Sequence, residues 1–233
     1  MWHLTYALHL ELDLLAESPS DDGRRRARAL LAGVSRIEHD GGWTYTAPIL
    51  LLLVRAKELG LPVDAAQIGR AARFLERNRV PRTPVFHYGP TMEHMSGEPG
   101  KTDEKSTCMR TPACELALVA AGAEKGTKGL SEAFDLYLAR APSARATQKI
   151  FESYVDVTNL QDSYRWFFGA YYAAQCISRL PDARRKKAAA RLDALLRAEQ
   201  EMDGSFVDSQ MVGKPSSTAL ALLALAEVRA ALR

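Results

Sequence analysis

Side chains able to bind a ligand gather at the start of the most apolar stretches of the sequence. They are Arg110, Tyr164, Arg165, Trp166, Phe168 and Tyr171. Aromatic rings offer large apolar surfaces and π faces that attract cations, and an arginine in an apolar setting needs a partner. One interpretation is a ligand site, and the competing one is an aromatic core with structural salt bridges. Gly169, among these rings, allows either close helix contact or space for a ligand.

Three carboxylic acids are candidates for acid chemistry, namely Glu115, Asp156 and Asp162. A positioned carboxylic acid can donate a proton to a reacting group. The same side chains could instead pair with Arg110 or Arg165, because a buried guanidinium requires a counter-charge. For the two arginines we favour such salt bridges over anion recognition. Whether the chain is an enzyme therefore stays open.

Histidine and cysteine give a weaker signal. His87, His94, Cys108 and Cys114 are of the types that zinc prefers, but their spacing matches no zinc motif and Pro112 separates the two cysteines. Cys108 lies near an expected helix start, which lowers a thiol pKa, and either histidine could serve as its base. The spacing favours neither role, so we expect no metal and no cofactor.

The composition is that of an ordinary globular protein. The 233 residues are 47% hydrophobic and 25% charged, with a net charge of +3, which provides for both a core and a solvated surface. Basic residues concentrate at 24–28 and 184–187. We interpret these runs as solvated faces of outer helices rather than as contacts with nucleic acid or an anionic membrane.

Cysteine usage and hydropathy bear on localisation. The three cysteines form an odd set without framework spacing, which indicates free thiols in a reducing compartment. The longest purely apolar run, Ala47–Val54, is too short to span a bilayer, and no signal peptide is visible. We expect a cytoplasmic chain without a transmembrane segment, unless a leader peptide has been removed.

Helical periodicity runs through the whole sequence, and no convincing alternating strand interrupts it. The expected helices are Trp2–Glu17, Asp22–Glu38, Trp43–Gly60, Asp64–Arg79, Ser106–Gly122, Lys128–Ala141, Arg145–Val155, Ser163–Leu180, Asp182–Glu201 and Ser216–Leu232. Asp64 is expected to cap its helix, and Ser216, Ser217 and Thr218 are expected to be N-terminal caps of the last one.

The expected helices alternate in character along the chain. The stretches Ala47–Val54, Ala113–Ala121, Trp166–Ala174 and Ala219–Ala226 are apolar on nearly every side. The helices at 22–38, 64–79 and 182–201 are amphipathic and rich in arginine. A helix that is apolar all round must be covered all round, whereas an amphipathic one can face water. This alternation predicts a single all-α domain over residues 1–233, a two-layered α/α toroid or α-solenoid.

The connection from an outer to an inner helix recurs with similar chemistry. Residues 37–45 and 195–206 both end a helix, turn through Asp-Gly and place an aromatic residue, Trp43 or Phe206, shortly afterwards. Glycine adopts the left-handed backbone that stops a helix. The aromatic ring is expected to pack over the helix end, and Gln200 to bond exposed backbone groups there.

This repeat resembles a known family. The string Leu196-x3-Gln200-x3-Gly204-x-Phe206 resembles the QW repeat of squalene–hopene and oxidosqualene cyclases, with Phe in place of Trp, and Gly41-Gly42-Trp43 is similar but lacks the glutamine. The chain thus resembles prenyltransferase/squalene-oxidase repeat proteins of the terpene cyclase and protein prenyltransferase superfamily. The resemblance implies an α/α toroid whose aromatic-lined central cavity binds an apolar or extended, isoprenoid-like ligand.

The chain also departs from that family. It has no Asp-x-Asp-Asp acid motif, no Gly-Cys-Gly-Glu-Gln string and no recognisable zinc triad of Asp, Cys and His, and its length implies a small or incomplete ring. We therefore expect neither a standard cyclase nor a standard prenyltransferase. One alternative is a non-catalytic scaffold for a peptide or protein partner. The other is a divergent isoprenoid-processing enzyme that uses a carboxylic acid. In each case we expect no nucleic-acid partner.

Overall fold

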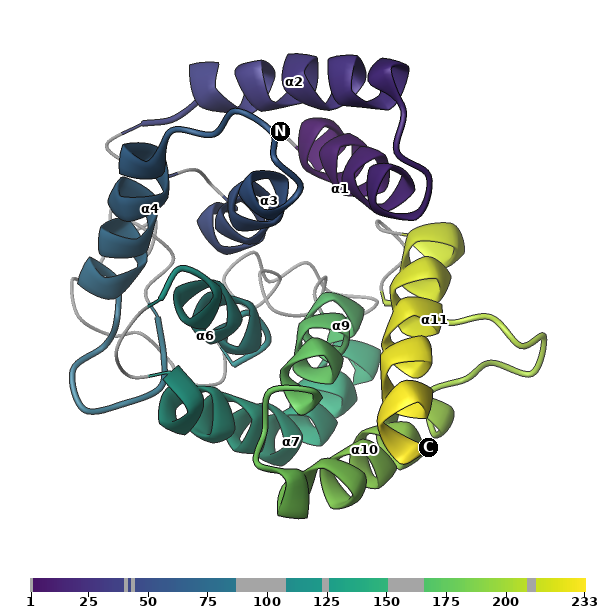
Figure 1. The fold of residues 1–233 in the computed structure, drawn as a ribbon. Helices are drawn as coiled ribbons and strands as arrows, with labels where there is room; N and C mark the ends of the chain where they lie inside the picture. The colour runs from purple at the N-terminus through teal and green to yellow at the C-terminus, as the bar shows by residue number, and fades with distance from the viewer. Residues whose placement is uncertain are drawn as a thin grey trace. The chain divides into compact units, whose positions relative to one another are not determined.

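The computed structural model describes residues 2–39, 42, 45–86, 108–122, 126–150, 166–208 and 213–233 (Figure 1). Within these ranges the chain is all-helical, as predicted, and its extended pairing is limited to two isolated bridges. The helices are α1 (Trp2–Glu17), α2 (Asp21–Arg36), α3 (Thr46–Glu58), α4 (Ala65–Arg77), α6 (Thr111–Ala120), α7 (Gly126–Ile150), α9 (Trp166–Ile177), α10 (Asp182–Arg197) and α11 (Gly213–Leu232).

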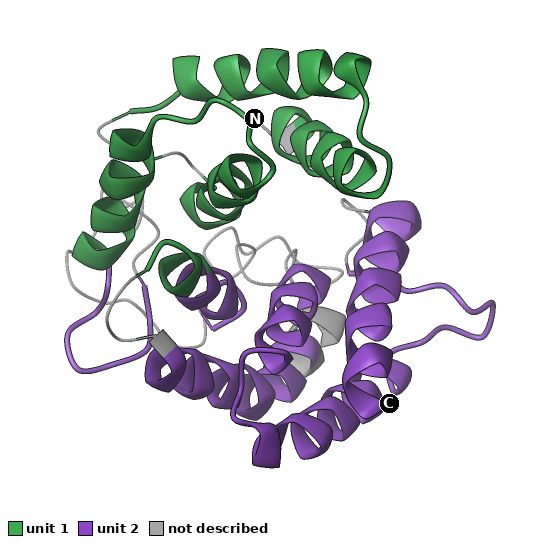
Figure 2. Cartoon of the chain, in the orientation of Figure 1, with its two compact units in different colours: residues 1–78, 117–124 green, residues 79–116, 125–233 purple. Residues whose placement is uncertain are grey.

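These helices fall into two compact units (Figure 2). Unit 1 comprises residues 1–78 and 117–124, and unit 2 comprises residues 79–116 and 125–233. Helices α1 to α4 belong to unit 1 and α7 to α11 to unit 2, while α6 begins in unit 2 and ends in unit 1. The expectation of one domain over the whole chain stays a prediction.

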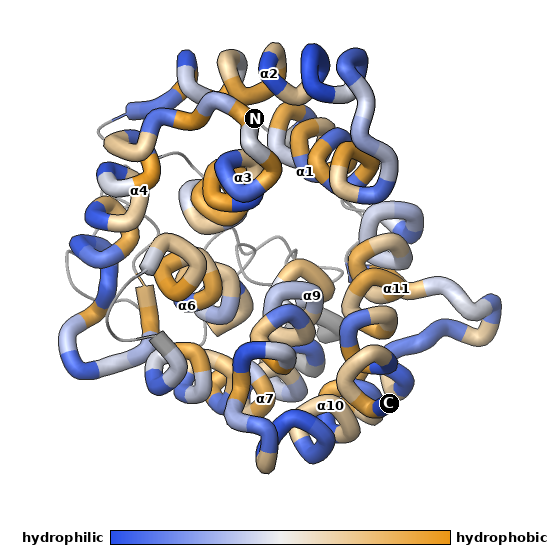
Figure 3. Tube along the Cα trace, viewed as in Figure 1, coloured by the Kyte–Doolittle hydropathy of each residue, from blue (hydrophilic) through white to orange (hydrophobic). Residues whose placement is uncertain are grey.

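In unit 1, α3 is the buried helix, and α1 and α4 pack on it. Helix α2 packs on α1 and buries only a stripe that includes Ala27, Leu31 and Val34. Hydrophilic residues follow the other side of α2 and of α4 (Figure 3). As expected, Asp64 caps α4, with its carboxylate accepting the Ala66 N–H at 2.8 Å. This unit therefore has the predicted alternation of buried and half-exposed helices.

In unit 2, α9 is the buried helix, and it packs against α7, α10 and α11. The prediction of full coverage is wrong for α11. Its Ala221, Ala224 and Leu225 are buried, but Leu222 is 57% exposed and Leu223 47% exposed. Among the described helices, α11 is the one with the length and composition to cross a membrane. One face of α11 packs on α9 and α10, and a single helix of this kind is weak evidence for a membrane span.

Helix α7 corrects a predicted boundary. The expected helices Lys128–Ala141 and Arg145–Val155 are continuous over Gly126–Ile150, with Pro142 inside. A proline within a helix removes one backbone hydrogen bond and favours a break. Here tertiary bonds flank it, since the Ala141 carbonyl accepts the Trp166 indole N–H at 2.9 Å and Arg145 is anchored to the 207–208 segment. Packing thus overrides the local preference.

Helix α6 starts later than predicted, at Thr111 instead of Ser106. Pro112 occupies its first turn, where the missing N–H of proline costs nothing because no helical acceptor precedes it. Residues 108–110 form a turn that leads into the helix. The proline therefore marks the true start of α6.

Candidate functional site

The described residues include only part of the predicted site. Asp156, Asp162, Tyr164 and Arg165 lie outside them, as do His87, His94 and Trp43. Arg110, Glu115, Trp166, Phe168 and Tyr171 lie within them. All five belong to unit 2, on α6, on α9 or in the turn before α6.

Glu115, a candidate acid, forms a buried ion pair. Its side chain is 1% exposed and pairs with Arg79, whose guanidinium carbon lies 4.6 Å from the centre of the Phe86 ring. A Cβ atom on Gly129 would come within 2.7 Å of a Glu115 carboxylate oxygen, so the carboxylate rests against the first turn of α7. Arg110 donates to the Phe86 carbonyl. These contacts tie α6 to α7 and to the 79–86 segment.

Trp166 lies in an aromatic core. Its ring centre is 4.8 Å from that of Phe167 and 6.4 Å from that of Tyr137, and Phe167 in turn lies 5.4 Å from Phe206. Since the indole N–H also bonds to the Ala141 carbonyl, the side chain has apolar neighbours and a satisfied polar atom. These contacts are those of a structural anchor for α9.

Phe168, Tyr171 and Tyr172 form a separate group on α9. The ring centre of Tyr172 lies 4.7 Å from that of Phe168 and 5.0 Å from that of Tyr171. Phe168 lies three residues before Tyr171 and four before Tyr172, and residues at these spacings share one side of a helix. All three side chains are buried. The group is therefore distinct from the rings of Trp166 and Phe167.

Gly169 provides close helix contact. A Cβ atom there would lie 2.6 Å from the Met109 carbonyl oxygen and 2.9 Å from Cε2 of Tyr137. No side chain fits in this gap without movement of the backbone. Of the two roles expected for this glycine, the structure supports close contact between α9 and its neighbours.

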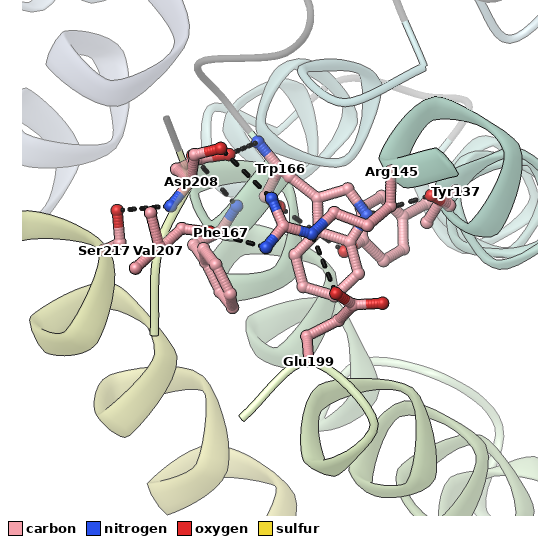
Figure 4. Close-up of polar contacts among 9 residues, drawn as sticks. Tyr137, Arg145, Trp166, Phe167, Glu199, Val207, Asp208 and Ser217 are labelled. Atoms are coloured by element: carbon pink, nitrogen blue, oxygen red, sulfur yellow. Dashed lines mark hydrogen bonds and ion pairs between the residues drawn. The ribbon is translucent and has the colours of Figure 1, made fainter. Parts of the chain in front are cut away.

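A buried carboxylate that was not among the predicted site residues lies at the start of α9 (Figure 4). Asp208 is 1% exposed, and its two carboxylate oxygens accept the backbone N–H groups of Trp166 at 3.2 Å and Phe167 at 3.4 Å. The first N–H groups of a helix need such acceptors and favour negative charge. Asp208 also donates its own N–H to Ser217 Oγ at 2.9 Å. It therefore joins the α10–α11 connection to both α9 and α11.

Arg145 of α7 completes this cluster from the other side (Figure 4). Its Nη1 donates to the Asp208 carbonyl at 3.0 Å and its Nη2 to the Val207 carbonyl at 2.6 Å. Its Nε bonds to a Glu199 carboxylate oxygen at 2.8 Å. The guanidinium carbon lies about 6 Å from the first two rings of α9. One side chain thus links α7, the end of α10 and the segment before α11.

Burial dominates the electrostatics of these groups. It raises the pKa of Asp208 to about 7, against the opposing effects of the Phe167 N–H, Arg145 and the Trp166 N–H. Burial also raises the pKa of Tyr137 well above its usual value, and Asp208, Cys108 and Glu199 add to the shift. A carboxylate removed from water loses hydration that neighbouring dipoles only partly replace. Asp208 can therefore exchange a proton near neutral pH.

The cysteines are buried and free. Burial raises the pKa of the Cys114 thiol to about 11 and raises that of Cys176 further, so both are protonated at neutral pH. Cys108, for which the sequence did not favour a nucleophilic role, is buried at the start of the turn 108–110 that leads into α6. Within the described ranges, no three His, Cys, Asp or Glu side chains gather as metal ligands do.

The repeat motif at residues 200–206 has the expected local structure. Gly204 adopts a left-handed backbone with φ of 82°, Phe206 is buried against Phe167, and the Gln200 amide donates to the Gly204 carbonyl at 3.0 Å. The N-cap roles predicted for Ser216, Ser217 and Thr218 are wrong, because α11 begins at Gly213 and all three lie inside it.

The hydroxyls of Ser217 and Thr218 instead bind the connection before α11. Ser217 Oγ accepts the Asp208 N–H, and Thr218 Oγ1 accepts the Phe206 N–H at 3.0 Å. One signal for Asp208 was available in the sequence. It follows Phe206 by two residues, so in an extended segment the two side chains share one face.

Comparison with models of protein families, with curated proteins and with solved structures finds no match to this chain. The geometry described above is therefore the basis for assigning a function.

Proposed function

We propose that this chain is an α/α toroid-like repeat domain, similar to terpene cyclases and protein prenyltransferases, that binds an apolar or extended isoprenoid-like ligand. The ligand would lie against Phe168, Tyr171 and Tyr172 of α9. The observation that carries the proposal is the division of the α9 aromatic residues into two groups. Trp166 and Phe167 anchor the helix to Tyr137 and Phe206, and Phe168, Tyr171 and Tyr172 form a second cluster of buried rings that contact one another.

The chemistry of α9 defines the class of ligand. The helix contains no charged residue over Trp166–Ile177, so recognition through this helix is apolar. Ligand sites typically combine such apolar linings with a few placed polar groups. An extended hydrocarbon fits this description.

Probe binding tests the proposal. A fluorescent farnesyl probe is titrated against the protein and against Phe168→Leu, a substitution that removes one ring of the aromatic face. We expect about a tenfold weaker Kd, which corresponds to about 1.4 kcal/mol. Phe167→Leu on the same helix is the matched control, because it alters the anchoring group; it should lower stability and leave the Kd unchanged. Failure of the unmodified protein to bind the probe, or equal effects of both variants, would rule out this site.

A scaffold for a peptide or protein partner is the second candidate. Helix α1 supports it, because Tyr6, Leu10 and Leu14 recur every fourth residue and are 41%, 60% and 46% exposed. Such a stripe suits an amphipathic helical partner. The test is capture of helical peptides from a library by the unmodified protein and by Leu10→Ser. Failure of the farnesyl probe to bind, together with peptide capture that Leu10→Ser abolishes, would favour the scaffold.

The third expectation, an enzyme that uses a carboxylic acid, gains less support. Of its three candidate acids, Asp156 and Asp162 lie outside the described residues, and Glu115 is held in an ion pair with Arg79. Groups held in this way by the protein are structural in character.

A further inference from the structure

The Asp208 cluster is the point at which four parts of unit 2 meet. Asp208 lies in the connection between α10 and α11 and binds the first amides of α9. Arg145 reaches it from α7, and Ser217 reaches it from α11. A change in the charge of this carboxyl therefore acts directly on the start of α9 and, through its electrostatic interaction with Arg145, on α7.

Charged and titratable groups surround the carboxyl. Arg145 and Tyr137 of α7 interact with it electrostatically, Glu199 in the turn after α10 binds Arg145, and Cys108 lies near Tyr137. The start of α9 contributes backbone N–H groups and α11 contributes the Ser217 hydroxyl. Burial opposes ionisation of Asp208, while the helix amides and the guanidinium favour it. Burial outweighs the amides and the guanidinium, which raises the pKa of Asp208 to about 7.

We propose that Asp208 is a proton-responsive latch that fixes the start of α9 to the α10–α11 connection. The proton comes from solution and binds one carboxylate oxygen. When Asp208 is ionised, both oxygens accept helix N–H groups, but a negative charge is buried. When it is protonated, the charge is removed, and the oxygen that carries the proton is a poorer acceptor. Protonation therefore stabilises the fold and loosens one of the two contacts with α9.

The sign of the effect follows from linkage. The pKa of Asp208 is higher in the folded protein than the usual 3.8, so between about pH 4 and pH 7 the folded state binds more protons than the unfolded state. Stability must then fall as the pH rises through this range. For a difference of one proton, the unfolding equilibrium constant rises up to tenfold per pH unit.

Chemical denaturation between pH 5 and pH 8 tests the latch. The expected result is that the unfolding constant of the unmodified protein rises with pH and that Asp208→Asn lacks most of this rise. Asp135→Asn is the control, because Asp135 is a half-exposed surface carboxylate of the same unit; it should keep the rise. His9 also titrates with a lowered pKa and acts in the opposite direction, so the difference between the protein and Asp208→Asn is the quantity to compare.

A second measurement covers the case in which Asp208→Asn does not fold. In the unmodified protein labelled with carbon-13 at aspartate side chains, one carbonyl resonance should titrate near neutral pH in the folded state. Over the same range, the Trp166 and Phe167 amides should exchange with solvent faster as the pH falls, after correction for intrinsic rates. The latch is refuted if all aspartates stay ionised from pH 5 to pH 8, or if Asp208→Asn folds and keeps the full pH dependence.

Discussion

Gly169→Ala is the sharpest test of how α9 is held. The new Cβ atom would lie 2.6 Å from the Met109 carbonyl oxygen and 2.9 Å from the Tyr137 ring. Carbon and carbonyl oxygen ordinarily approach to about 3.3 Å, so α9 or the turn at Met109 must move by roughly 0.7 Å. The first obstacle is backbone, which cannot rotate away as a flexible side chain would.

The expected loss follows from two opposing effects. Overpacking of a tight core costs about 1–3 kcal/mol, and the absence of a flexible neighbour places this site near the upper end. Alanine gains about 1 kcal/mol over glycine within a helix. The net expectation is a loss of about 2 kcal/mol, measured by urea denaturation followed by far-UV circular dichroism.

Gly33→Ala is the matched control in α2. A Cβ atom there meets only Leu4 side-chain carbons at 3.5 Å and beyond, which is ordinary contact. The same substitution should therefore stabilise unit 1 by about 0.5–1 kcal/mol. The account of close packing at α9 is wrong if Gly169→Ala is as stable as Gly33→Ala.

Two further substitutions test the repeat and the cluster. Phe206→Ala removes the buried aromatic residue of the repeat motif and its edge contact with Phe167. Urea denaturation should show a loss of about 3–5 kcal/mol in the free energy of unfolding. A loss below about 1 kcal/mol would show that the ring does not stabilise the turn. Arg145→Met leaves the Glu199 carboxylate and the carbonyls of 207 and 208 without this donor. It should lower the free energy of unfolding by about 3–5 kcal/mol. Arg184→Met is the control and should be nearly neutral, because Arg184 belongs to an exposed ion pair.

The helices were predictable because their apolar residues follow a clear period. Helix α1 has the predicted bounds, and α10 has the predicted start. The errors arose where tertiary contacts outweigh local signals. Pro142 indicated a break that the Trp166 and Arg145 contacts prevent, and the apolar sequence of α11 indicated coverage that its exposed leucines lack.

The candidate site was harder to predict, because its chemistry depends on distant contacts. Arginine at 145 was expected only as the start of a helix, yet it bonds to residues more than fifty positions away. Asp208 acquires its unusual proton affinity from burial against α9, which no local pattern records. The aromatic richness of α9 was visible in the sequence, but its division into two groups required the ring positions.

The composition of unit 1 has a consequence for synthesis of the chain. Residues 1–78 leave the ribosome first, but the unit also includes residues 117–124. At about 5–20 residues per second, residues 79–116 take roughly 2–8 s to make. During that time α1 to α4 exist without their last segment, and their apolar surface is accessible to chaperones or to neighbouring nascent chains. Slow translation between residues 79 and 116 should therefore lower the yield of folded protein, whereas slow translation after residue 124 should spare unit 1.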